Sequence, residues 1–212
     1  MSRLTVSINF ALSADGKISS AQKRPSGWTS REDHARLLEL RKGADALMVG
    51  RGTLESDRMT MKAPHDPLRC VVSRSGEFDP EHPLFHTPGG AIHLLATEDR
   101  GRKGREIPGA ILHRGSVEHF LDELAGLGVR RVHCEGGGEL VFVLLERDLV
   151  DEIHLTWAGH RLFGGHGAPT VSGVPGEFLP ASRQFELTEF DPRPETGECF
   201  LSYRRVREAG AQ

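Results

Sequence analysis

Residues 132–148 read VHCEGGGELVFVLLERD, a strand pattern that passes through glycines into a helix pattern. A β-like run ends in the carboxylate of Glu135, three glycines follow, and an apolar helix pattern begins at Leu140. Such a junction leaves bare backbone N–H groups at the positive end of a helix dipole, where a phosphate can bind. The three glycines are not the complete dinucleotide fingerprint, so spacing alone leaves open a glycine-rich turn that binds no ligand.

Strand and helix patterns alternate along most of the chain. We expect strands over residues 4–10, 46–49, 68–72, 91–96 and 131–134, and helices over residues 30–42, 117–127 and 140–149. The last third loses the helices and reads as β-runs at residues 152–158, 183–190 and 198–206. This order predicts an α/β fold with a mixed, mostly parallel sheet that finishes in antiparallel strands. Residues 29–32 read as a capping box before the first helix.

Composition limits the class of partner. The 212-residue chain has 27 Lys and Arg against 30 Asp and Glu, which is not the basic balance of a nucleic-acid-binding protein. Residues 1–10 lack the pattern of a signal peptide, and the longest apolar run, residues 140–145, is too short to cross a bilayer. The three cysteines are odd in number and far apart in the sequence, which favours reduced, buried thiols at Cys70, Cys134 and Cys199. We therefore expect a cytoplasmic protein with a small-molecule partner and with no nucleic acid or membrane partner.

A second glycine-bearing strand end lies at Gly50, followed by Gly52, Thr53 and Asp57. Ligands of α/β proteins gather at the carboxyl ends of the strands, so two such ends with polar neighbours predict one site. A tight turn without a ligand remains the alternative for these glycines.

One pattern imitates a metal site. His133-Cys134-Glu135 matches the His-x-Glu half of a zinc deaminase. The Pro-Cys-x-x-Cys half is absent from the downstream sequence, so a zinc ion would lack ligands. We expect no metal.

Five blocks of sequence resemble a known family. In order, they match the reductase domain of bifunctional riboflavin-biosynthesis deaminase-reductases, which is similar to dihydrofolate reductase; the blocks are ALSADGKIS (11–19), SGWTS (26–30), LRKGADALMVGRGTLESD (40–57), EGGGEL (135–140) and LFGGHGAPTVSG (162–173). The resemblance implies a three-layer α/β/α sandwich and a homodimer. It also implies an NADPH-dependent reductase of the 5-amino-6-(5-phosphoribosylamino)uracil reductase type, which converts a ribosylamino-pyrimidine phosphate to its ribitylamino form. We expect residues 1–212 to form a single reductase domain without a deaminase domain.

The resemblance also implies roles for individual residues. Cofactor contacts fall on Leu12, Trp28, Gly50, Thr53, Asp57, Arg74, Gly137, Gly138, Glu139 and Leu140. Substrate contacts fall on Ser26, Arg41, Met61 and Glu135. Arg74 would bind the 2′-phosphate. Apart from the resemblance, Glu135 and Asp57 are the carboxylates at strand ends and so the candidates for proton transfer, with water as the alternative donor. Outside the resemblance, Arg41 reads equally well as a solvated helix residue, and Trp28 as part of the core or its cover.

Three departures from the family pattern concern the substrate. Asn9 stands where many of these enzymes have lysine, and His160 where proline is expected. The arginine that grips the substrate phosphate is unmatched after Asp57, so Arg58 or Lys62 would have to replace it. Two alternatives follow. One is an NADPH-dependent reductase of a folate, a pterin or another heterocycle, and the other is a catalytically silent nucleotide-binding protein.

Overall fold

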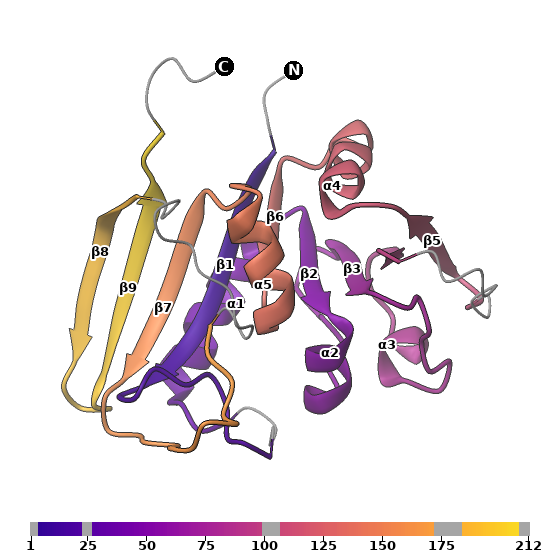
Figure 1. Ribbon diagram of the computed structural model, residues 1–212. Coiled ribbons are helices and arrows are strands. Elements are labelled where there is room, and N and C mark those ends of the chain that lie inside the picture. The colour runs from indigo at the N-terminus through magenta and orange to yellow at the C-terminus, as the bar shows by residue number, and fades with distance from the viewer. Residues whose placement is uncertain (1–3, 23–26, 99–106, 172–183, 208–212) are drawn as a thin grey trace.

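The computed structural model describes residues 4–22, 27–98, 107–171 and 184–207. In these ranges nine strands form one sheet in the order β5-β4-β3-β2-β6-β1-β7-β9-β8 (Figure 1). The strands are β1 Thr5–Ser13, β2 Ala46–Gly50, β3 Leu68–Ser73, β4 Ile92–Ala96, β5 Ala110–Arg114, β6 Arg131–Cys134, β7 Glu152–Ala158, β8 Phe185–Arg193 and β9 Glu198–Arg205. The helices are α1 Arg31–Lys42, α2 Arg51–Asp57, α3 Pro83–His86, α4 Val117–Gly126 and α5 Gly138–Glu146.

The sheet is parallel from β5 to β7, and β9 and β8 then pair antiparallel. The expected mixed sheet with antiparallel C-terminal strands is therefore confirmed. All the strands and helices predicted from the sequence are present. The structure adds α2, α3 and β5, which the hydrophobic patterns did not indicate.

Apolar side chains fill both faces of the sheet. One cluster joins the sheet to α4 and α5 through residues such as Ile8, Met48, Phe120 and Leu144. The other joins the opposite face to α2 and α3 through residues such as Leu47, Val49, Leu54 and Leu84. Since α1 lies behind the sheet in Figure 1 and α4 and α5 lie in front, the chain forms three layers.

Polar contacts help to hold helix α1, in which no residue is fully buried. Its N-cap is Ser30, whose hydroxyl accepts the N–H of Asp33 at 3.1 Å. The capping box expected at residues 29–32 is therefore wrong: Ser30 rather than Thr29 is the N-cap, and a residue of β9 takes the place of the reciprocal acceptor. Glu198 of β9 accepts the backbone N–H of Ser30 at 2.8 Å, and Asp33 instead accepts the hydroxyl of Thr156 at 2.5 Å. These bonds fix the helix over the sheet and so determine where its last turn ends.

Within the described ranges, no helix is long and apolar enough to cross a membrane. Cys70, Cys134 and Cys199 are free and buried, as expected from their spacing. Burial raises the pKa of the Cys134 thiol to about 12 and raises that of Cys70 further, so both thiols are protonated near neutral pH.

Candidate functional site

The two glycine turns lie side by side at the carboxyl edge of the sheet. Strands β2 and β6 are parallel neighbours, with Met48 opposite Cys134. Beyond the strands, Glu135 donates its N–H to the carbonyl oxygen of Met48 at 2.9 Å, and Gly50 donates its N–H to that of Gly136 at 2.7 Å. The expectation that the two strand ends adjoin is confirmed. β6 also lies between two strands formed much earlier in the chain, which is where α/β sheets place ligands.

Helix α5 begins directly at this junction, with Gly137 as its N-cap. The carbonyl oxygen of Gly137 accepts the N–H of Val141, so the amides of Gly138, Glu139 and Leu140 precede the first helical hydrogen bond. Leu140 buries its side chain in the core and is 6 % exposed, so it can serve a ligand only through its backbone. This first turn is suited to binding an anion.

The backbone at Gly137 lies so close to Thr53 that a side chain would not fit between them. A Cβ at this position would lie 2.5 Å from the hydroxyl oxygen of Thr53 on α2, closer than real Cβ contacts. At Gly50 a Cβ would lie 3.4 Å from the Gly137 nitrogen. The absence of side chains therefore brings Thr53 against the backbone of the α5 turn.

Arg41 and Glu135 form an ion pair at the end of β6. Nε and Nη2 of Arg41 each lie 2.6 Å from a different carboxylate oxygen of Glu135. The side chains are only 11 % and 5 % exposed. Burial opposes the charge of Arg41, but the hydrogen bonds and charge of Glu135 outweigh it and raise the arginine pKa. Arg41 is therefore not a solvated helix residue, and it also donates to the carbonyl oxygen of Lys62 at 3.0 Å.

The segment after α2 places the predicted residues differently. Asp57 ends α2 and accepts the hydroxyl of Ser56 at 3.3 Å. Met61 has a positive φ of 53° and turns its side chain into the core, where it is 2 % exposed. Only the backbone of Met61 is available to a substrate. Lys62 and Arg58 are exposed.

Arg74 meets the start of α5 from the end of β3. Its Nη2 lies 3.4 Å from Oε2 of Glu139, and both side chains are about two-thirds exposed. The pair brings together two residues predicted to contact the cofactor. An exposed pair of this kind contributes little stability and separates easily when a stronger ligand arrives.

The turn after β1 anchors a distant loop through Asp15. Its carboxylate accepts the hydroxyl of Ser13 at 2.6 Å and the N–H groups of Gly164 at 2.7 Å and Phe163 at 3.2 Å. The Ser13 hydrogen bond, followed by that of Gly164, lowers the pKa of Asp15 to about 2. Phe163 in turn meets Trp28 edge to face, with ring centroids 4.9 Å apart.

The sequence indicated Trp28 and the block at residues 11–19, which contains Asp15, but not their link through Phe163. Only a contact between the turn and residues 162–165 would have revealed it. Leu12 lies one residue before the end of β1, opposite Trp157 of β7. Ser26 lies outside the described residues.

His133 has a structural setting. The residue is 1 % exposed, and its Nδ1 lies 2.8 Å from the hydroxyl oxygen of Ser7. Burial, more than the nearby positive charges, lowers its pKa to about 3, so the ring is neutral. Among the described residues, no group of three or more His, Cys, Asp or Glu could hold a metal ion.

Sequence comparison connects this geometry to known proteins. A family model described as the RibD C-terminal domain matches residues 4–193. The 2,5-diamino-6-ribosylamino-4(3H)-pyrimidinone 5′-phosphate reductase of Archaeoglobus fulgidus is 31% identical over 186 residues, covering 78% of this chain and 84% of that protein. The protein of the same name from Methanothermobacter thermautotrophicus is 33% identical over 179 residues, covering 78% and 82%.

Solved structures show the same fold. RibD of Acinetobacter baumannii superposes with a TM-score of 0.80 at 17% identity, covering 97% of this chain and 59% of that chain. The riboflavin biosynthesis reductase Rib7 of Saccharomyces cerevisia gives 0.70 at 18% identity, covering 96% and 90%. A dihydrofolate reductase of Enterococcus faecalis gives 0.55 at 15% identity, covering 96% and 97%. The expected dihydrofolate-reductase-like α/β fold is therefore confirmed.

Proposed function

The chain belongs to the RibD C-terminal domain family, and from this membership we propose that it is an NADPH-dependent reductase of the riboflavin pathway. Its substrate in this proposal is 2,5-diamino-6-ribosylamino-4(3H)-pyrimidinone 5′-phosphate, named in the relatives that are 31% and 33% identical. The single structural observation that carries the proposal is the hydrogen bond from Gly50 to Gly136. It joins two glycine turns beside one open helix N-terminus.

The described residues fit a dinucleotide. Gly137 provides a cradle that a Cβ would fill, and the first amides of α5 can donate to a pyrophosphate. Arg74 can exchange Glu139 for a 2′-phosphate, a doubly charged and stronger partner, and this exchange would favour NADPH over NADH. When bound, the nicotinamide would supply the hydride that reduces the sugar carbon.

Glu135 is suited to hold the pyrimidine. Its carboxylate has capacity for further hydrogen bonds after the two from Arg41, so it can accept ring N–H or amino donors of the substrate. Arg41 fixes the direction in which those lone pairs point. Because Glu135 is committed to this pair, the proton that completes the reduction would come from Asp57 or from water.

Lys62 is the proposed ligand of the substrate phosphate. Its carbonyl oxygen is held by Arg41, so its backbone lies beside the Arg41–Glu135 pair, and its side chain is exposed. A lysine can bind a phosphate as a point charge where the family arginine is missing.

A homodimer is part of the proposal because one sheet face is open. No described helix covers β8 and β9 on the side of α5 (Figure 1). Trp157, Leu187 and Phe190 share that face and are 49%, 52% and 65% exposed. An apolar face of this kind is suited to a second copy of the chain. Phe190→Asp should yield monomers in sedimentation, whereas Glu186→Gln on the opposite face should not; a wild-type monomer would refute the dimer.

The cytoplasm is the proposed location, since the three buried thiols are free.

The test of function is NADPH oxidation with a panel of substrates. The proposal predicts turnover with the diaminopyrimidinone phosphate, and slower turnover with its deaminated uracil analogue. Activity on dihydrofolate alone would instead favour the alternative heterocycle reductase. NADPH binding without turnover of any pyrimidine or pterin would favour the silent nucleotide-binding protein.

A further inference from the structure

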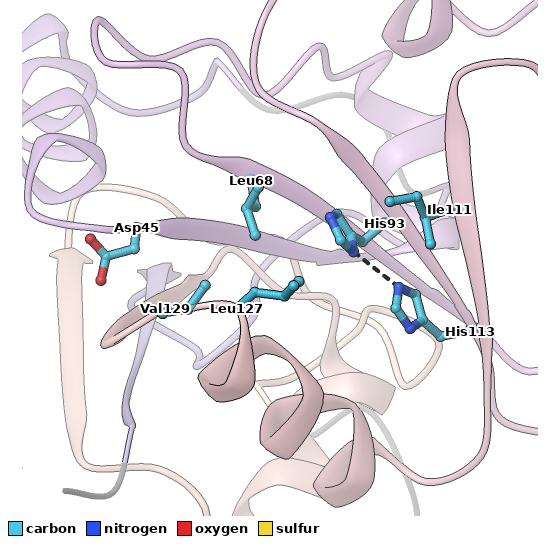
Figure 2. Close-up of a pocket in the computed structure, with 8 residues that line it drawn as sticks. Asp45, Leu68, His93, Ile111, His113, Leu127 and Val129 are labelled. Carbon is cyan, nitrogen blue, oxygen red and sulfur yellow. Dashed lines mark hydrogen bonds between the residues drawn. The ribbon is translucent and has the colours of Figure 1, made fainter. Parts of the chain in front are cut away.

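A hollow of about 560 Å³ lies at the opposite, amino-terminal edge of the parallel strands (Figure 2). Leu68 begins β3, and His93 is the second residue of β4, whereas the glycine turns follow the last residues of β2 and β6. The loop after α4 contributes Leu127 and Val129 to the wall. The hollow is therefore separate from the proposed reductase site, and its volume is in the range of small-molecule pockets.

Most of the wall is aliphatic. Leu68, Ile111, Leu127 and Val129 contribute side chains, and Ile111 and Leu127 are 52% and 61% exposed. Asp45 also lines the hollow, but its Oδ2 already accepts the backbone N–H groups of Arg130 at 2.7 Å and Arg131 at 2.9 Å. A ligand would therefore gain mainly apolar contacts from this wall.

Two histidines and a glutamate form a chain of hydrogen bonds beside the wall. Nδ1 of His93 lies 2.9 Å from Nε2 of His113. A dashed line marks this contact in Figure 2. Nδ1 of His113 lies 2.8 Å from Oε2 of Glu123 on α4. His93 is 3 % exposed, and burial lowers its pKa, with His113 lowering it further, so its ring is neutral near pH 7.

The glutamate determines where the protons lie. A carboxylate only accepts, so Nδ1 of His113 carries a proton, and in the neutral form of this ring Nε2 is then the unprotonated nitrogen. Nδ1 of His93 must then donate to that Nε2, which leaves Nε2 of His93 as an unprotonated acceptor. Among the described residues this nitrogen has no hydrogen-bond partner. This row of hydrogen bonds therefore presents one acceptor, Nε2 of His93, in a largely apolar hollow.

We propose that this hollow is a second small-molecule site, which takes a flat, mostly apolar heteroaromatic ligand with one N–H donor bound to Nε2 of His93. The aliphatic wall supplies the contact area, and the single acceptor selects the donor. A ligand of the same shape without the donor would leave Nε2 unpaired, which costs more than the bond itself contributes.

The experiment compares indole with benzofuran, which has the same shape but an oxygen in place of the N–H. Both are titrated into the full chain labelled with ¹⁵N in histidine. The proposal predicts an unprotonated Nε2 resonance for His93 that moves on addition of indole. It also predicts that indole binds at least about tenfold more tightly than benzofuran, consistent with one buried acceptor left unpaired.

Glu123→Lys tests the assignment of the protons along the hydrogen bonds from Glu123 through His113 to His93. A lysine only donates, so both histidines should reverse their tautomers and His93 should present an N–H, which removes the preference for indole. The control is Glu118→Lys on the same helix. Native Glu118 pairs with Arg147 and not with a histidine, so this variant should keep the preference for indole over benzofuran. A protonated Nε2 in the wild type, no indole binding, or equal binding of the two ligands would overturn the proposal. NADPH binding is measured separately, so its failure would not affect this result.

Discussion

Gly50 donates its backbone N–H to the carbonyl oxygen of Gly136 across 2.7 Å, which fastens the turn before α2 to the turn before α5. The junction depends on the absence of a side chain at Gly137, because a Cβ there would lie 2.5 Å from the hydroxyl oxygen of Thr53, whereas a Cβ at Gly50 would make only ordinary contact with the Gly137 nitrogen at 3.4 Å. The proposed phosphate site is thus part of the backbone, and it should be sensitive to single methyl groups.

Gly137→Ala should weaken NADPH binding. The new Cβ would lie 2.5 Å from the Thr53 hydroxyl oxygen, so the hydroxyl and the turn must separate. We expect the Kd for NADPH to rise about tenfold, which corresponds to about 1.4 kcal/mol, with a smaller effect on the substrate. The matched control is Gly52→Ala, where nothing lies within 4 Å of the new Cβ. Equal losses for cofactor and substrate would mean that the turn is only structural.

The Arg41–Glu135 pair should stabilise the fold as well as hold the substrate. Either Arg41→Gln or Glu135→Gln leaves a nearly buried charge without its partner, at a cost of about 3 kcal/mol in the free energy of unfolding. The double variant should lose less than the sum of the single losses. Urea denaturation measures all three. The exposed pair of Lys42 and Glu39 on the same helix is the control and should contribute under about 1 kcal/mol.

Lys62→Ala should raise the KM for the phosphorylated substrate about tenfold and change kcat little, since the lysine would hold a group remote from the reacting carbon. The dephosphorylated substrate provides the decisive comparison, because the variant and the wild type should then have the same KM. Lys42→Ala is the control for loss of a surface charge. If Lys62→Ala affects both substrates equally, the lysine does not bind the phosphate.

Stability should fall as the pH drops from about 4 to about 2, in part through Asp15. The pKa of this carboxyl is lowered from 3.8 to about 2 in the folded protein, so the unfolded chain takes up the proton first. The contribution is present above pH 4 and is lost as the pH approaches 2. Thermal unfolding of Asp15→Asn should show a shallower acid decline than the wild type. Identical pH profiles would show that the carboxylate does not anchor residues 163–164.

The sequence predicted the elements with a clear hydrophobic pattern, the four-residue β6 among them, and missed α2, α3 and β5. α2 follows β2 without a loop, and Gly50 and Gly52 in that stretch read as a turn. β5 is a short strand at the edge of the sheet, and its mixed burial gives no clear alternation. These elements depend on tertiary contacts more than on local pattern.

The site was predictable where it consists of backbone. Strand ends and glycines indicate a junction, so the meeting of Gly50 and Gly136 followed from the sequence. Side-chain partners were not predictable, because Arg41 and Glu135 are 94 residues apart and nothing local pairs them. The burial of Met61 depends on a positive φ, which its sequence does not signal. The His93–His113 contact required β5, which was missed.

Calorimetric titration of NADPH into the purified chain measures whether the joined glycine turns bind a dinucleotide. We expect one NADPH bound per chain, with weaker binding of NADH because Arg74 would lose the 2′-phosphate. The same titration of Gly137→Ala should show the weakened affinity, and Gly52→Ala should match the wild type. Absence of NADPH binding to the folded wild-type protein would contradict the proposal that the joined glycine turns hold a dinucleotide.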